Sequence, residues 1–153
     1  MDLSKVFLTV AEVSEAIGMK PATASQWILD GFLGGPGDKL AEVAGATTYL
    51  SIQTAAALAI ANRLRKMGAS REVACKAGKE FTELKVPKYE GKGTSKPFTS
   101  WLIVFPDGEI VVASFEEKPT KRELQEDCWR IRWEPIVQKV MAAYAFRLPR
   151  GQL

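Results

Sequence analysis

The sequence predicts a mainly α N-terminal domain that begins with a helix-turn-helix, followed by a small α+β module that contains an antiparallel hairpin. Three observations predict this fold class. Apolar residues recur at helical spacing through residues 8–84, a polar stretch follows at 86–97, and the period then changes to the alternation typical of strands. The expected units are therefore a domain at residues 1–85, a flexible linker at 86–97 and a module at 98–153.

Two short helices joined by a tight turn are expected between Leu8 and Leu33. Thr9 and Glu12 have the spacing of a capping box, which would fix the start of the first helix. Gly18 suits a sharp turn with positive φ, and Pro21 suits the first turn of the second helix. A helix, a three-residue turn and a helix form a unit that can place its second helix in a DNA major groove. The same unit is also common in all-α domains that have no nucleic-acid role.

A wing and two more helices are expected after this unit. Residues 34–38 are rich in Gly and Pro and predict a loop, and residues 43–50 include side chains suited to a short strand. A loop and a short strand between two helical pairs have the composition of a wing. A helix capped by Ser51 is then expected over residues 52–67, and another helix over residues 71–84.

The C-terminal module is expected to begin with a hairpin. Residues 98–105 and 109–115 have the composition of strands, and Pro106-Asp107-Gly108 between them is a strong turn signal. Thr120 is expected to cap a short helix that ends near Asp127.

A third strand with one apolar and one basic face is expected where large apolar residues alternate with arginines, at Trp129, Arg130, Ile131, Arg132 and Trp133. The two tryptophans would either form a stacking platform for bases or pack the sheet on the last helix, and the packing interpretation is favoured. That last helix restarts at Pro135. Its apolar stripe is more extensive than so small a unit can bury alone, which predicts a homodimer.

Composition excludes several classes of function. Hydrophobic residues make up 46% of the 153 residues and charged residues 25%, as in ordinary globular proteins. The net charge of +3 is spread over both halves, so a basic patch would need clustering in three dimensions. Two cysteines and no histidine cannot build a structural zinc site, and a catalytic site, a metal site and a cofactor are not expected. The lack of a signal pattern and of a long apolar run predicts a cytoplasmic protein without membrane contact.

Several segments follow one family's pattern in order, namely Thr9–Val13, Gly18–Pro21 with Thr23 and Trp27, Gly31–Leu33 and Leu64–Ser70. Together they resemble the MerR-like winged helix-turn-helix family over residues 7–84. The resemblance implies binding of double-stranded DNA. The expected DNA-contact residues are Lys20, Ala22, Thr23, Ser25, Gln26, Trp27, Lys39, Thr48, Arg63, Lys66 and Arg71.

The chain also departs from this family. Ala22 and Ser25 stand where family members often carry an arginine, and Ala46-Thr47-Thr48 stands where the wing usually shows Gly-Tyr-Arg. Each missing arginine removes a phosphate contact.

The sequence thus predicts a sequence-specific DNA-binding transcriptional regulator of phage or mobile-element origin, and it assigns no small-molecule effector. Gln26 is expected to read the edge of an adenine, and the cations among the expected contact residues are expected to lie along the DNA backbone. Two alternatives stay open. One is an architectural factor of excisionase or small-terminase type that bends or bridges DNA. The other is a protein-interaction adaptor whose helix-turn-helix no longer binds DNA.

Overall fold

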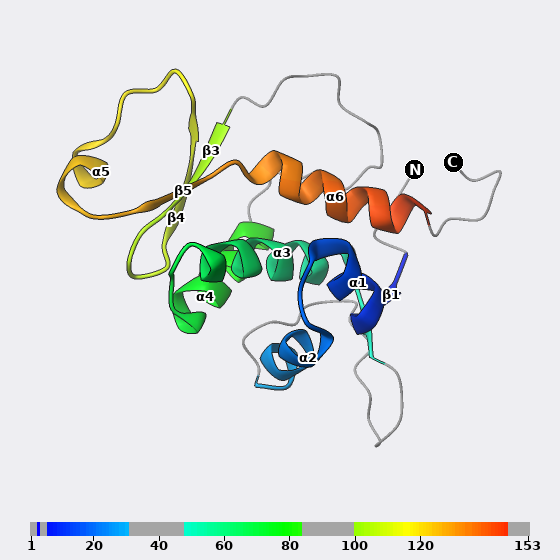
Figure 1. Ribbon diagram of the computed structural model, residues 1–153. Helices are drawn as coiled ribbons and strands as arrows, with labels where there is room; N and C mark the ends of the chain where they lie inside the picture. Colours follow the sequence, from blue (N-terminus) through cyan, green and yellow to red (C-terminus); the bar gives the residue numbers. More distant parts are fainter. Residues whose placement is uncertain (1–2, 4–5, 31–47, 84–99, 147–153) are drawn as a thin grey trace.

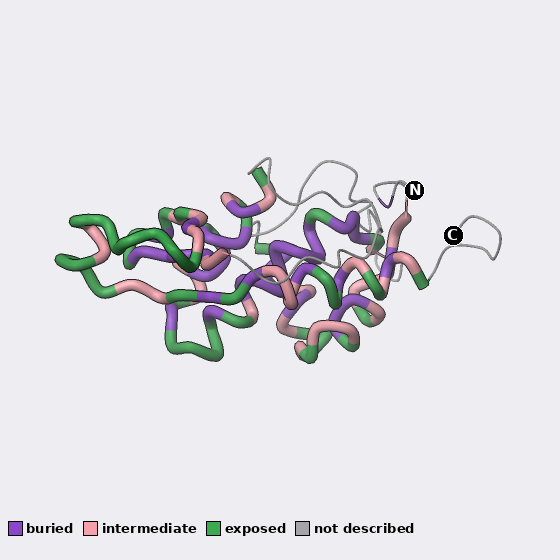
Figure 2. The backbone as a smooth tube through the Cα atoms, turned by 90° about the horizontal axis from the view of Figure 1, so that it is seen from above, coloured by how far each residue is buried: buried purple, intermediate pink, exposed green. Residues whose placement is uncertain are grey.

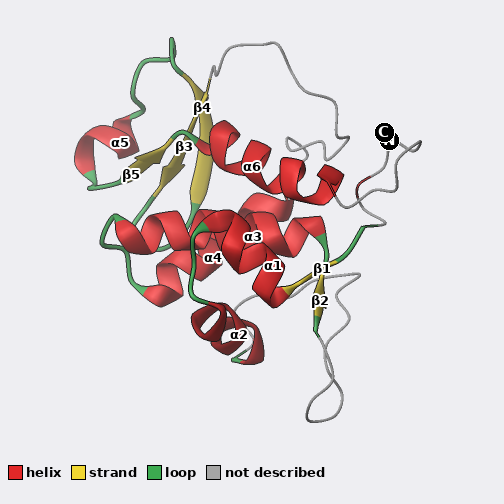
Figure 3. Ribbon diagram, turned by 45° about the vertical axis from the view of Figure 1, so that its right-hand side comes forward, coloured by secondary structure: helices red, strands yellow, loops and turns green. Residues whose placement is uncertain are grey.

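The computed structural model describes residues 3, 6–30, 48–83 and 100–146, which form six α-helices and two small antiparallel sheets (Figures 1 and 3). This mixture of helices and strands agrees with the predicted α+β composition. The expected loop at 34–38, Lys39 and the expected linker at 86–97 lie outside the described residues. No helix in the described part of the chain has the length and apolar character that crossing a bilayer requires.

The first two helices, α1 (Val10–Ile17) and α2 (Pro21–Leu29), begin as their local sequence predicts. The Thr9 hydroxyl accepts a hydrogen bond from the Glu12 backbone N–H, and the Glu12 carboxylate accepts one from the Thr9 N–H (3.2 Å). Gly18 adopts a φ of 70°, which lets the chain turn sharply between the helices. The capping box and the glycine turn are therefore confirmed.

The centre of the molecule is α3 (Ile52–Lys66), which packs closely against α4 (Arg71–Glu83). Ser51 caps α3 through the Thr54 N–H, as predicted. A short sheet, β1 (Leu8–Thr9) paired with β2 (Tyr49–Leu50), joins the start of α1 to the start of α3. The sequence pattern predicted β2 but missed β1, whose two residues depend on their partner for their conformation.

The second sheet has the strand order β4–β3–β5. It consists of β3 (Ser100–Val104), β4 (Ile110–Ser114) and β5 (Trp129–Ile131), with α5 (Lys121–Gln125) between β4 and β5. The predicted turn between β3 and β4 is confirmed, and Gly108 at its end has a φ of 86°.

The predicted third strand is wrong at its end, because Trp133 is the first residue of α6 (Trp133–Phe146). The Trp133 indole N–H donates a hydrogen bond to the Ser100 hydroxyl (3.0 Å), and its ring lies 5.4 Å from that of Phe81. With 8% of its surface exposed, Trp133 packs the last helix against α4 and β3. This agrees with the packing interpretation of this residue.

One hydrophobic core runs across the expected domain boundary, since α6 packs on α1 and α3 (Figures 2 and 3). Val137, Val140 and Tyr144 on α6 are buried in the same cluster as Val13 of α1 and Leu58 of α3. The Tyr144 hydroxyl lies 2.8 Å and 3.0 Å from the carbonyl oxygens of Leu50 and Ser51. The apolar stripe that predicted a homodimer is thus covered by the chain itself, so it no longer supports one.

Candidate nucleic-acid interface

The helix α2 lies at the outer end of the molecule, away from α6 and the three-stranded sheet (Figure 1). Its inner side is buried in the core through Ala24, Trp27 and Ile28. Its outer side exposes Lys20, Ala22 and Gln26, while Thr23 and Ser25 are half-buried.

Gln26 is held in place by a chain of polar contacts. Its side-chain N–H donates to the carboxylate of Asp30 (2.8 Å), and Asp30 forms a salt bridge of 3.2 Å with Arg71 at the start of α4. Two of the expected contact residues are therefore brought together by an acidic residue that sequence reasoning missed. The spacing of four between Gln26 and Asp30 was the available signal, because such pairs meet on one face of a helix.

Trp27 does not lie at this surface, although it was among the expected contact residues. Only 6% of it is exposed, because α2 turns its apolar side towards the core at this position. It therefore stabilises α2 and offers no side chain to a ligand. Thr48, just before β2, is half-buried.

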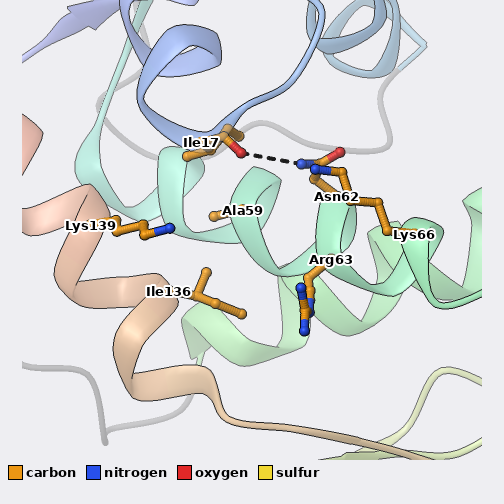
Figure 4. A pocket seen from close by; sticks show the side chains of 7 residues that line it. All are labelled: Ile17, Ala59, Asn62, Arg63, Lys66, Ile136 and Lys139. Atoms are coloured by element: carbon orange, nitrogen blue, oxygen red, sulfur yellow. Dashed lines mark hydrogen bonds between the residues drawn. The ribbon is translucent and has the colours of Figure 1, made fainter.

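Arg63 and Lys66 line a cleft between α3 and α6 (Figure 4), and no residue of α2 belongs to the lining that the structure describes. This part of the cleft has a volume of about 140 Å³ and is lined by Ile17, Ala59, Asn62, Arg63, Lys66, Ile136 and Lys139. An adjoining hollow of about 410 Å³ is lined by Arg63, Met67, Trp101, Arg130, Ile131, Arg132, Pro135, Ile136 and Lys139. Because the two share Arg63, Ile136 and Lys139, we treat them as one surface, the basic cleft.

The basic cleft has five cationic side chains and no carboxylate among its lining residues. Arg130 forms a salt bridge of 3.2 Å with Glu123. Across the described segments, the other four cations (Arg63, Lys66, Arg132 and Lys139) form no salt bridge. Sequence reasoning assigned Arg130 and Arg132 to a solvated strand face and gave Lys139 no role, since nothing local shows that α6 lies beside α3.

Arg122 on α5 is a cation whose guanidinium is paired with several carboxylates. Its guanidinium is 2.5 Å from the carboxylate of Glu109 and 2.6 Å from that of Glu126, and it stacks 3.9 Å from the centre of the Phe105 ring. The hydrogen bond to Glu109, followed by that to Glu126, raises the pKa of Arg122 above its ordinary value. Arg122 is therefore a cross-link within the sheet region, in contrast to the four cations of the basic cleft that form no salt bridge within the described residues.

The two cysteines, Cys75 and Cys128, are free thiols. Burial raises the pKa of the Cys75 thiol to about 11, so it is protonated at neutral pH and a poor nucleophile. Where the structure describes the chain, no group of three or more potential metal ligands comes together.

No protein-family model matches this chain, and no curated protein matches it. Its function is therefore to be inferred from the geometry of α2 and of the basic cleft.

Proposed function

We propose that this protein is a sequence-specific double-stranded-DNA-binding protein that uses a winged helix-turn-helix to regulate transcription. The observation that carries the proposal is the unit α1–turn–α2, with α2 at the outer end of the molecule and Gln26 fixed on its exposed side. A helix in this position can enter a major groove, which is about 12 Å wide in B-form DNA.

The chemistry of Gln26 suits an adenine. A glutamine amide carries two N–H donors and one carbonyl acceptor, and in this protein one donor is bonded to Asp30. The remaining donor and the acceptor match N7 and the amino group of adenine in the major groove. Asp30 therefore orients the amide before DNA arrives, which lowers the entropy cost of the contact.

The start of α2 suits a phosphate of the same groove. Lys20 is exposed there, and no side chain caps the helix. Because the first N–H groups of a helix lack acceptors within it, the N–H of Ala22 points outward together with the positive end of the helix dipole. In the proposed complex Lys20 and Ala22 bind one phosphate while Gln26 reads a base.

Gln26→Ala is expected to relax selectivity at one base pair. Loss of a bidentate contact costs about 1–3 kcal/mol, or about 5- to 150-fold in discrimination against the wrong base. The measurement is a selection from randomised duplexes with the full chain, followed by titration of the selected duplex and of its single-base variants. Gln125→Ala on α5 is the matched control, because that glutamine is also exposed but lies far from α2. If Gln26→Ala selects the same sequence with the same affinity, Gln26 is a surface residue only.

The same selection separates the other two functions. A chain that enriches no sequence and shifts no duplex in a gel is an adaptor without DNA binding. A chain that enriches a sequence and also bends it strongly in a circular-permutation assay is an architectural factor.

A homodimer on DNA is a further part of the proposal. One copy of α2 and its flanks carries few cations, so two copies on neighbouring half-sites would supply the phosphate contacts that useful affinity needs. Analytical ultracentrifugation of the chain with the selected duplex is expected to show two protomers per duplex. One protomer per duplex at saturating protein would contradict this part of the proposal.

A further inference from the structure

We propose that the basic cleft binds the phosphodiester backbone of nucleic acid, so that α6 and the three-stranded sheet extend the contact beyond α2. The inference rests on the proposed function in one respect, namely that the nucleic acid in the cleft is the duplex that α2 recognises.

The cleft collects cations from three elements that are distant in the sequence. Arg63 and Lys66 come from α3, and Lys139 comes from α6 on the other side of the cleft (Figure 4). Arg132, which directly follows β5, lines the adjoining hollow. Since the two hollows share lining residues, the positive charge continues from one into the other. Cations spread over two adjoining hollows fit an anion that repeats along a chain better than a single small anion.

The charge of the cleft stands out from the rest of the protein. The whole chain has a net charge of only +3, whereas this one surface carries five cations with no carboxylate in its lining. Arg122 is the contrasting case, because three carboxylates surround its guanidinium. Four cations left without such partners are stabilised when they neutralise phosphates and release the counterions condensed on the nucleic acid.

The aromatic side chain of Trp101 in the lining favours nucleic acid over an acidic peptide as the ligand of the basic cleft. Trp101 lines the wider part of the cleft, with the guanidinium of Arg132 lying 5.4 Å from the centre of its ring. The Phe115 ring packs against the indole at a centroid distance of 4.8 Å. Sugars and unstacked bases pack on such rings beside arginine, whereas an acidic peptide brings charge without a flat partner.

The test is a salt titration with Lys139→Gln, Arg132→Gln and the double variant of the full chain. Binding is measured by fluorescence anisotropy on a random-sequence duplex and on an oligothymidine strand. Each single change is expected to lower the slope of log K against log salt by about 0.9 on the duplex and about 0.7 on the single strand, and the double change by about twice as much. Lys79→Gln is the matched control, because Lys79 is exposed on α4, which contributes no residue to the described lining of the cleft, and this variant should keep the parent slope.

The outcomes separate this inference from the proposed function. If the selection finds no preferred duplex but the cleft variants still lower the salt slope, the cleft binds nucleic acid and the proposed function fails. If Gln26→Ala relaxes selectivity while both cleft variants keep the parent slope, the inference is overturned and the proposed function stands.

Competition with poly-glutamate tests whether the ligand of the cleft is instead an acidic peptide. If it competes as well as an oligothymidine of equal charge, and Trp101→Leu weakens neither, the cleft takes an acidic peptide and the inference is overturned.

Discussion

A chain that ends at Lys85 is expected to lose cooperative folding. This fragment lacks α6, whose side chains Val137, Val140 and Tyr144 close the core over α1 and α3. Burying one large apolar side chain contributes about 1.5–3 kcal/mol, so the loss of three approaches the whole stability of a typical domain, about 5–15 kcal/mol. Thermal and urea melts followed by circular dichroism are expected to show a broad, non-cooperative transition for the fragment and a sharp one for the full chain.

A point variant tests the same contact without removing the helix. Tyr144→Phe leaves the carbonyls of Leu50 and Ser51 without their hydroxyl partner, which is expected to cost about 1–3 kcal/mol. Tyr49→Phe is the matched control, because Tyr49 is 41% exposed and its change should cost little. A fragment ending at Lys85 that melts as sharply as the parent would instead show an independent N-terminal domain.

Gly78→Ala is expected to destabilise the protein by about 2 kcal/mol or more, even though the position is helical. In an exposed helix this change would stabilise by about 1 kcal/mol, because alanine has the higher helix propensity. In α4, however, an added Cβ would overlap the carbonyl oxygen of Ala57 on α3 and lie 3.2 Å from the carbonyl carbon. Backbone atoms cannot turn aside as a side chain does, so α3 and α4 would have to move apart.

Urea denaturation measures this effect directly. Lys79→Ala is the control, since it places the same residue at the next position of α4 but on the exposed side, where the change in stability should stay within about 0.5 kcal/mol. A stability for Gly78→Ala equal to or above that of the parent would mean that α3 and α4 are not packed this closely.

The ends of the elements were predictable because the interactions that set them are local. Thr9 and Glu12 form their capping box within one helical turn, and Ser51 and Thr120 cap α3 and α5 over the same distance. Gly18 and Gly108 take the left-handed conformation that their turns require. Such signals act over three or four residues, so they can be recognised before any tertiary contact is known.

Other features became clear only when distant segments met. The alternation of residues 129–133 predicted a strand two residues longer than β5, because Trp133 finds its hydrogen-bond partner on β3 and its ring partner on α4. Asp30 directly follows the last residue of α2. Its role follows from Gln26 within α2 and Arg71 at the start of α4, which it links.

By itself, the sequence determined the caps and the turns, which follow from the period and chemistry of neighbouring residues. Only the tertiary structure decided that α6 completes the core of the N-terminal helices and that Arg63, Lys139 and Arg132 share one cleft. The physical reason is that apolar burial is non-directional, so an apolar stripe shows that a helix must be covered without showing which surface covers it. Because α6 packs on α1 and α3, Lys139 and Arg132 lie in the same cleft as Arg63 of α3.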